Sequence, residues 1–400
     1  MFPEQNQIID QISESVIREM TRLAEKHQAI NLAQGLPDYP CPSLLKAHAQ
    51  DAIGADENQY SFTYGLKALR DAIAAKLLKR NQLQFEAETE ITVTCGVSEG
   101  LMATVLALGE PGAEFILLEP CYENYLPAVL LSGATPVPFT LNAPDWHIDF
   151  DELAKHFSHR TRAIILNNPM NPTGKVFSTE ELREIAMLCQ KWDTVALCDE
   201  IYEEMVYNEQ RHISMASLPG MRSRTVTIMG FSKTYSVTGW RVGYVAAYEA
   251  LSARIRKVHD YLTVCAPTPL QHACIAALSL PEQYYDDLKR FYYKKCRLFC
   301  LGLEYLGFRF AYPEAAYYVM ADFRDIFNGN DLKFSDWLLI DKGVAVVPGS
   351  SFYFSKKKYS RMVRFCFAKK EETLVAALRR MGRKIFRDHY RHVNKNGLLV

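Results

Sequence analysis

The residues best suited to chemistry in this chain lie in the segment MGFSKTYSVTGWRVGY, residues 229–244. Its first residues end a predicted strand, so Ser232 and Lys233 emerge at the carboxyl end of that strand, where open α/β sheets bind their ligands. A lone lysine at such a place is usually a solvated loop residue. Arg241 follows eight residues later among glycines that permit close backbone approach, and this combination favours a reactive amine.

Three further segments follow predicted strands and carry polar residues. The turn NNPMNPTG spans residues 167–174, CDEIYEEMVY spans residues 198–207, and TCGVSEG spans residues 94–100. The first two have ordinary structural explanations, turn formation and capping of a helix by an acid. The third ends a strand and begins a helix, whose first amides can bind a phosphate. Together with residues 229–244 they supply lysine, arginine, aspartate, tyrosine and asparagine. That set suits a charged aromatic cofactor bearing a phosphate.

The elements that must position these segments are short strands alternating with helices between about residues 90 and 250. The helical pattern TEELREIAMLCQKW, for example, begins after a cap at Ser178 or Thr179. Such alternation predicts a mostly parallel sheet covered by helices on both faces. The predicted strands are Ile91–Thr94, Glu114–Leu118, Arg162–Leu166, Thr194–Cys198, Thr225–Met229 and Val242–Ala246.

After about residue 281 the pattern changes to one long helical run, several short strands and a final helix from Lys370 to about Arg387. This indicates a smaller α+β unit, and we expect a large domain at residues 46–280 and a small domain made of residues 1–45 and 281–400. The basic C-terminal tail is expected to be solvated. The predicted strands of the smaller unit are Phe308–Tyr312, Tyr318–Asp322, Val344–Val347 and Arg361–Phe367.

The composition excludes several other classes of protein. With 46 basic and 46 acidic residues the chain has no net charge, so no nucleic-acid partner is expected. The ten cysteines include no C-x-x-C pair and several lie in apolar runs, which indicates buried thiols in a reducing compartment. There is no signal-peptide pattern and no apolar run long enough to span a bilayer, so we expect a cytoplasmic protein without a membrane partner.

Several motifs in a fixed order carry a resemblance to a known family. SKTYSVTGWRVG, NPxNPTG and DEIY, flanked by NLAQGLPDYP, YSFTYGLKALR, EPCYENY, VVPGSSFY and VRFCFA, resemble the signature motifs of class I aminotransferases. These are pyridoxal-phosphate enzymes of fold type I, and the resemblance covers roughly residues 30 to 370. The chain looks closest to the branch of kynurenine, glutamine and aspartate-type enzymes. The resemblance implies a seven-stranded, mostly parallel sheet in the large domain, pyridoxal 5'-phosphate as cofactor, and a homodimer.

The resemblance also implies roles for the residues around the cofactor ring. Lys233 matches the lysine that holds the cofactor as an internal aldimine and then carries a proton between the substrate Cα and the cofactor. Asp199 matches the partner of the pyridine nitrogen, which keeps the ring protonated as an electron sink. Tyr202 matches the donor to the phenolic oxygen of the ring, and Tyr122 matches an aromatic residue stacked on the ring.

Other matched residues bind phosphate or substrate. Arg241 matches the phosphate-binding cation, Ser232 is a weaker match near it, and the amides of Val97 and Ser98 match the phosphate cradle at a helix start. Tyr60 matches a tyrosine that reaches the phosphate from the neighbouring subunit.

The substrate-binding match centres on Arg364. It corresponds to the arginine that clamps the α-carboxylate, where a planar fork suits a planar anion. Asn171 and the amide of Gly35 are expected to assist it, and Asn171 also contacts the cofactor in the family.

Three positions depart from the family pattern. Gly230 stands where many relatives have a serine that binds phosphate, and Ser232 is a candidate to compensate. Ala315 stands where relatives usually have glycine, and its methyl group is expected to shift a loop near the substrate. Ile17 stands where the kynurenine-handling members have an aromatic residue, which weakens the prediction of an aromatic substrate.

Alternative functions remain open at the level of sequence. We predict a transaminase that uses an L-amino acid and a 2-oxo acid and passes through a pyridoxamine intermediate. The same apparatus also supports elimination or cyclisation of an amino acid, and nothing in the sequence selects the substrate. A regulatory protein that only retained the fold is disfavoured because Lys233 and its partners are present.

A remote alternative is a serine hydrolase, because GVSEG fits the G-x-S-x-G elbow with Ser98 as nucleophile. It would need a histidine such as His212, His259 or His272, and none of these has a recognisable surrounding motif. The HFSH and HYRH segments lack a zinc-binding pattern, so no metal is predicted.

Overall fold

The computed structural model describes residues 7–207, 211–354 and 361–382 of the chain. The basic C-terminal tail, its HYRH segment, and the predicted helical residues beyond Gly382 lie outside the described residues. Within the described part, no helix has both the length and the apolar character needed to cross a membrane.

The larger sheet has seven strands in the order β2-β8-β7-β6-β5-β3-β4. Only β8 runs antiparallel to its neighbours, so the sheet is mostly parallel, and the predicted α/β fold is confirmed. The strands are β2 (Ile91–Thr94), β3 (Glu114–Glu119), β4 (Thr135–Thr140), β5 (Thr161–Asn167), β6 (Val195–Asp199), β7 (Thr225–Gly230) and β8 (Gly243–Ala247).

All six strands that the sequence predicted in this sheet are present, and β4 was missed. Its sequence TPVPFT contains two prolines, which argue against a central strand because proline cannot donate to the ladder. The structure places β4 at the edge of the sheet, where it pairs only with β3. An edge strand tolerates proline on its unpaired side, and this position resolves the conflict.

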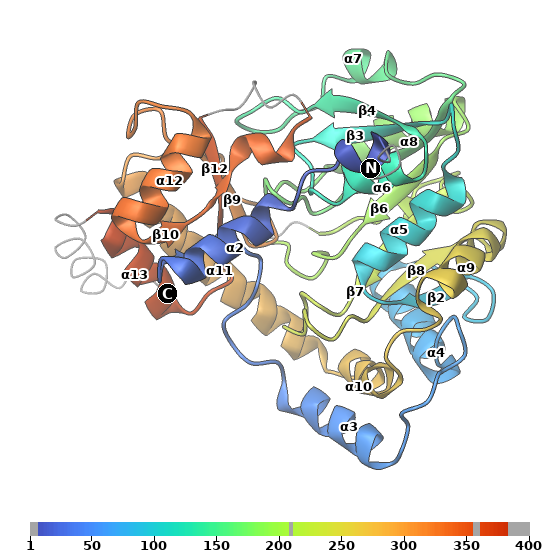
Figure 1. The fold of residues 1–400 in the computed structure, drawn as a ribbon. Helices are drawn as coiled ribbons and strands as arrows, with labels where there is room; N and C mark the ends of the chain where they lie inside the picture. The colour runs from blue at the N-terminus through green and yellow to red at the C-terminus, as the bar shows by residue number, and fades with distance from the viewer. Residues whose placement is uncertain (1–6, 208–210, 355–360, 383–400) are drawn as a thin grey trace, which may run out of the picture.

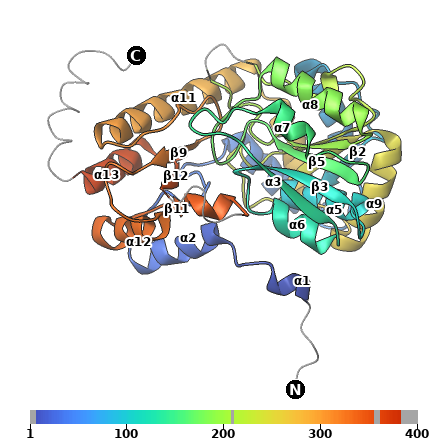
Figure 2. The same cartoon turned by 90° about the horizontal axis from the view of Figure 1, so that it is seen from above.

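Residues of β3 alternate between the two faces of the sheet. Phe115 and Leu117 pack in one apolar cluster with α5 (Val97–Leu108) and α9 (Glu249–Thr263), whereas Ile116 and Leu118 pack in another with α8 (Thr179–Lys191). Figure 2 shows α5, α6 (Tyr125–Leu131) and α9 on one side of the sheet and α8 on the other. Of the two predicted caps of α8, Ser178 and Thr179, the structure has Ser178 at the N-cap, where it forms a capping box with Glu181.

A second sheet of three antiparallel strands has the order β11-β12-β9. These strands are β9 (Tyr318–Asp322), β11 (Val347–Pro348) and β12 (Met362–Cys366), and they pack with α11 (Glu282–Tyr305), α12 (Asp331–Lys342) and α13 (Glu371–Met381). The predicted strand at residues 308–312 was wrong, because this segment forms only an isolated bridge at Arg309. Its rings pack instead, with Phe310 against Tyr312.

The N-terminal residues join the second sheet region. β1 (Ile30–Asn31) pairs in parallel with β10 (Val344–Ala345), and α2 (Val16–Lys26) contacts β10 and β11. Figure 1 shows α2, in blue, beside the orange C-terminal elements. The division into domains at residues 45 and 280 stays a prediction, but this pairing agrees with placing the N-terminal segment beside the C-terminal part.

The remaining helices complete the molecule. α3 (Ser43–Gly54) packs against α10 (Thr268–Leu278), and α10 also contacts α4 (Lys67–Lys76). The short elements are α1 (Gln7–Asp10), η1 (Leu77–Asn81), α7 (Phe150–Ala154), η2 (Met215–Ser217) and η3 (Gly349–Phe352).

Candidate active site

Three neighbouring parallel strands of the large sheet end at residues that the sequence singled out. β5 ends at Asn167, β6 at Asp199 and β7 at Gly230. Because these strands are parallel neighbours, the residues that follow them, including Asn171 and Lys233, leave the sheet at the same edge. The structure thus brings together three of the four segments by strand topology alone.

Lys233 has a half-buried side chain whose amine donates a hydrogen bond to the carbonyl of Gly35 at 3.2 Å. Burial lowers the pKa of Lys233 to about 8, and the positive charges of Arg241 and Arg364 act in the same direction. An amine with this pKa is partly neutral near pH 7 and therefore has nucleophilic and basic character.

Asp199 is buried at the mouth of β6, and its carboxylate has two hydrogen-bond donors. Tyr125 donates from its hydroxyl at 2.8 Å, and the amide of Ile201 donates at 3.2 Å. Burial raises the pKa of Asp199 to about 6, while these hydrogen bonds and Lys233 oppose the rise. The carboxylate is thus anionic above pH 6 and is ready to pair with a positive group. No sequence motif assigned a role to Tyr125, which begins α6.

Arg364 is fully buried on β12, and its guanidinium has only neutral partners within the described residues. One nitrogen donates to the side-chain carbonyl of Asn171 at 2.9 Å, a second donates to the carbonyl of Ala33, and Nε has no hydrogen-bond partner there. The rings of Tyr318 and Phe352 lie 4.4 Å and 5.0 Å from its central carbon. A buried cation without a carboxylate partner is costly, which indicates a site for an anionic ligand.

Tyr202 and Tyr122 lie near these charged groups. Tyr202 is buried, and its hydroxyl lies 3.1 Å from the hydroxyl of Tyr318. Burial raises the pKa of Tyr202, and the neighbouring hydroxyl of Tyr318 raises it further, so Tyr202 keeps its proton and can donate it in a hydrogen bond. Burial also raises the pKa of Tyr122 to about 12, and the charge of Arg364 opposes the rise.

The start of α5 lies against Arg241. Gly96 caps this helix with φ of +78°, and a Cβ at this glycine would lie 2.6 Å from the guanidinium of Arg241. That guanidinium donates to the carbonyls of Cys95 and Thr238 at 3.3 Å and 3.0 Å, and the side chain is exposed. A helix N-terminus with a cation beside it is suited to a phosphate group.

Three other predicted residues occupy different surroundings. Ser98 is exposed in the first turn of α5, where Asn124 donates to its hydroxyl at 3.5 Å, and Ser232 is buried beside Lys233. Tyr60 is 81% exposed and lies among the outward-facing residues of the chain.

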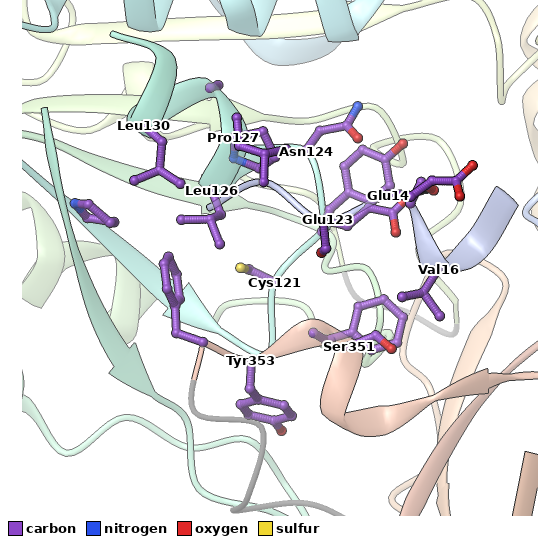
Figure 3. A pocket seen from close by; sticks show the side chains of 18 of the residues that line it. Glu14, Val16, Cys121, Glu123, Asn124, Leu126, Pro127, Leu130, Ser351 and Tyr353 are labelled. Carbon is purple, nitrogen blue, oxygen red and sulfur yellow. Dashed lines mark hydrogen bonds between the residues drawn. The ribbon is translucent and has the colours of Figure 1, made fainter. Parts of the chain in front are cut away.

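A cavity of about 1110 Å³ adjoins the site. Tyr122, Ser98 and Phe352 line it together with the segment before α2 and the outer face of α6. Figure 3 shows Glu123 in this cavity near Glu14 and Val16, with Leu126, Pro127 and Leu130 along the wall.

Glu123 ties the start of α2 to the loop that carries Tyr122. Its carboxylate accepts from the hydroxyl of Ser15 and from the amide of Ile17, the latter at 3.5 Å. Ile17 itself is buried in the core. Sequence reasoning missed Glu123, because its partners lie more than a hundred residues away.

A second group of buried charges lies close to Asp199, and we call it the inner ion network: Lys76, Glu200, Glu203 and His212. Lys76 forms an ion pair with Glu203, and His212 forms one with Glu200 at 2.9 Å. The two glutamates and the histidine have atoms within 4.8 Å of one another, a spacing compatible with a metal ion.

The second carboxylate oxygens of Glu200 and Glu203 also accept hydrogen bonds. Asn81 donates to Glu203 at 2.7 Å, and Ser214 donates to Glu200 at 2.8 Å. A metal ion would have to displace these partners and share the space with the Lys76 ammonium. We therefore interpret the group as a structural network.

The hydrolase alternative loses its support in the structure. Within the described residues, no histidine hydrogen-bonds Ser98. His212 pairs with Glu200, and His259 lies between Glu99 at 3.0 Å and the carbonyl of Thr63 at 2.8 Å. Ser98 therefore lacks the general base that a nucleophilic serine requires.

Two of the departures from the family pattern have packing explanations. A Cβ at Gly230 would lie 3.0 Å from Val97 and 3.1 Å from Ile201, so a serine there would be crowded. Ala315 is fully buried in a small cluster with Val176 and Val206, and this gives its methyl group a packing role rather than a role in the cavity.

The residues of the site fit pyridoxal 5'-phosphate. The fit rests on three observations: a half-buried amine of lowered pKa at Lys233, a buried carboxylate at Asp199, and a helix start at Gly96 held open beside Arg241. Their charges act on one another, since Asp199 and Arg241 both influence the pKa of Lys233.

Comparison with known proteins identifies the class. The model of the family "Aminotransferase class I and II" matches residues 27–381, and the chain belongs to this family of pyridoxal-phosphate-dependent enzymes. It is similar to methionine aminotransferase of Escherichia coli, with 36% identity over 93% of this chain and 96% of that protein. It is also 36% identical to human kynurenine–oxoglutarate transaminase 3 over 92% of this chain and 88% of the relative.

Comparison with solved structures identifies the same class of enzyme. N-succinyldiaminopimelate aminotransferase from Mycobacterium tuberculosis superimposes with a TM-score of 0.92 at 34% identity, covering 94% of this chain and 99% of that one. The protein is therefore a pyridoxal-phosphate-dependent aminotransferase with the fold of its relatives, and amino acids and 2-oxo acids are its substrate classes.

Proposed function

We propose that this enzyme moves the amino group of an L-amino acid to a 2-oxo acid, with Lys233 as the covalent anchor of the cofactor and as the proton carrier. The observation that carries the proposal is geometric: Asn171, Asp199 and Lys233 lie at the ends of the neighbouring parallel strands β5, β6 and β7, and the half-buried amine of Lys233 donates to the carbonyl of Gly35. When bound, pyridoxal 5'-phosphate withdraws electrons from the substrate Cα and so loosens its proton.

Lys233 performs the proton transfer in this proposal. Its amine is free to hold a proton taken from the substrate Cα, because burial lowers its pKa to about 8. The carbonyl of Gly35, which accepts its hydrogen bond at 3.2 Å, holds the amine in place between transfers.

Asp199 and the aromatic residues orient the ring of the cofactor. The buried carboxylate of Asp199, which accepts a hydrogen bond from Tyr125, would hold the pyridine nitrogen of the bound cofactor in its protonated form. Tyr202 would supply a hydrogen-bond donor to the phenolic oxygen of the cofactor, and Tyr122 would supply an aromatic surface for its ring.

The substrate carboxylate binds between Arg364 and Asn171. Nε of Arg364 has no partner among the described residues, so an incoming carboxylate supplies both charge and a hydrogen-bond acceptor. The amide of Gly35 assists.

The phosphate binds at the start of α5. The amides of Val97 and Ser98 are unpaired first-turn donors of this helix, and Arg241 lies against its N-cap Gly96. In our proposal Ser232 adds a hydroxyl ligand to the phosphate.

A homodimer completes the site in our proposal. Tyr60, Phe62 and Tyr261 are 81%, 60% and 93% exposed, which is unusual for large aromatic side chains and suits an interface with a second copy. The loop that holds Tyr60 is fixed on α10, since Thr268 and Gln271 bond to Gln59 and Ser61. Tyr60 then reaches the phosphate of the neighbouring subunit. The cytoplasmic location stays a prediction, and we also propose a role in amino acid biosynthesis.

The relatives differ in substrate, since their names include methionine, kynurenine and N-succinyldiaminopimelate. Elimination or cyclisation of an amino acid is the second candidate, because it starts from the same proton removal by Lys233.

One experiment separates the two candidates. A panel of amino acids is added to cofactor-loaded protein without any 2-oxo acid, and absorbance and products are followed. We expect one equivalent of 2-oxo acid per site and then no further reaction, with the reactive amino acid identifying the donor. Repeated turnover with release of ammonia or a cyclic product would instead establish the lyase or cyclase.

A further inference from the structure

Tyr318, on β9, contacts three residues of the proposed site: Tyr202, Arg364 and Gly35. Its hydroxyl lies 3.1 Å from that of Tyr202, and its ring lies 4.4 Å from the guanidinium carbon of Arg364. A Cβ at Gly35 would lie 1.9 Å from the Tyr318 hydroxyl, so the hydroxyl occupies space that only a glycine leaves free. The carbonyl of the same glycine accepts the hydrogen bond from Lys233.

We propose that Tyr318 is a positioning residue that couples the carboxylate site at Arg364 to the ring-binding hydroxyl of Tyr202. The inference rests on the proposed function, because it takes Tyr202 as the donor to the cofactor ring. It adds a residue that neither the sequence motifs nor the comparisons single out.

The direction of the hydrogen bond follows from the single proton of each hydroxyl. In the proposed site Tyr202 donates its one hydroxyl hydrogen to the phenolic oxygen of the cofactor ring. Its own oxygen then accepts a hydrogen bond from the hydroxyl of Tyr318. A hydroxyl that accepts a hydrogen bond becomes a better donor, because the two bonds polarise each other. Tyr318 therefore strengthens and orients the bond from Tyr202 to the ring.

The ring of Tyr318 has a separate task. The Tyr318 ring lies 4.4 Å and the Phe352 ring 5.0 Å from the guanidinium carbon of Arg364, so both aromatic rings attract this cation. This arrangement stabilises a buried cation that has no carboxylate partner within the described residues, and it keeps the fork facing the substrate. The hydroxyl and the ring of one side chain thus serve two different groups.

The two tasks separate by substitution. Tyr318→Phe removes the hydroxyl and keeps the ring, whereas Tyr318→Leu removes both. Tyr285→Phe is the matched control, because Tyr285 is also buried and its hydroxyl is also paired with a tyrosine, Tyr235, at 2.8 Å.

Two quantities are measured on cofactor-loaded protein without substrate. The first is the pKa of the bound cofactor, read from its absorbance between pH 5 and 10. The second is the dissociation constant of acetate, which carries a carboxylate and no amino group. We expect Tyr318→Phe to raise the cofactor pKa by about half a unit, because a weaker bond from Tyr202 stabilises the deprotonated ring oxygen less. Acetate affinity should stay within about twofold of the wild type in this variant.

Tyr318→Leu should raise the cofactor pKa equally and also weaken acetate about fivefold, from loss of the stacking on Arg364. Tyr285→Phe should change neither quantity. Adding Tyr318→Phe to Tyr202→Phe should give no further shift of the pKa, because the hydroxyl of Tyr318 acts only through Tyr202.

An unchanged cofactor pKa in Tyr318→Phe, or a shift that persists in the Tyr202→Phe background, would overturn the inference while leaving the enzyme's activity established. A wild-type protein that fails to take up pyridoxal 5'-phosphate would instead refute the proposed function, and the inference with it.

Discussion

Two groups of buried charges lie side by side in this enzyme, and they differ in how they are paired. In the inner ion network each charge faces an opposite charge: Lys76 meets Glu203, and His212 meets Glu200. At the site, Arg364 faces only carbonyl groups and aromatic rings within the described residues.

The difference separates a structural group from a binding group. In a buried ion pair the mutual attraction of the two charges offsets the cost of removing them from water, whereas an unpaired buried cation keeps that cost until an anionic ligand binds. The end of β6 and the turn that follows it contribute to both, since Asp199 belongs to the site while Glu200 and Glu203 belong to the network. Residue type therefore does not distinguish the two groups, but the partners do.

The largest expected effect is on catalysis at the site. Lys233→Ala should reduce turnover by about 10⁴-fold or more, because the proton carrier and the anchor are lost together. Stability should be unchanged or higher, since the folded state no longer contains a dehydrated amine. Steady-state kinetics and thermal melting of the same preparation test both parts, and multiple turnover at a wild-type rate would contradict the assignment.

The corresponding change in the network should act on stability instead. Lys76→Met should lower the free energy of unfolding by about 3 kcal/mol, because it leaves the buried Glu203 without its cation. Turnover per folded molecule should stay near that of the wild type. The double variant Lys76→Met with Glu203→Gln serves as control. Its free energy of unfolding, measured in urea, should return most of the way to the wild-type value.

Arg364→Lys should weaken carboxylate binding by about 100-fold without a large change in stability, because a lysine cannot reproduce the planar fork. Inhibition constants for a series of simple carboxylates measure this effect. If acetate binds equally to both proteins, the carboxylate does not bind at Arg364.

The lowered pKa of Lys233 can be tested without the cofactor. Labelling by acetic anhydride requires the neutral amine, so the reactivity of Lys233 should rise with pH and level off above about pH 8. Since the folded pKa lies below the ordinary lysine value, the stability cost of burial is fully present below pH 8 and is relieved as pH rises above it. The exposed Lys67 provides the internal standard in mass spectrometry. A plateau only near pH 10 would contradict the prediction.

The smallest effect is expected at His212. Burial by itself would lower the pKa of His212, but the facing Glu200 raises it overall. Its contribution to stability is thus fully present below the ordinary histidine pKa of about 6.5 and is lost as pH rises through the higher folded value. His212→Gln should flatten this decline in urea unfolding between pH 6 and 8. An identical pH profile in both proteins would show that the pair is not charged.

Much of the fold was predictable because the residues that a strand or helix buries are apolar and recur with the period of that element. The six predicted strands of the large sheet appear in the structure, and the motif residues after β6 and β7 lie at its carboxyl edge. The failures have local causes: β4 contains prolines that only an edge position accommodates, and residues 308–312 alternate like a strand but pack their rings instead.

By itself the sequence determined the class of enzyme, the cofactor and the residues that leave the strand ends, since these depend on short motifs and on the period of apolar residues. Only the tertiary structure decided that Tyr318 meets Tyr202, that Glu123 holds the start of α2, and that β1 pairs with β10. These contacts join segments more than a hundred residues apart. Their existence depends on strand register and on the packing of distant elements, and neither leaves a local pattern in the chain.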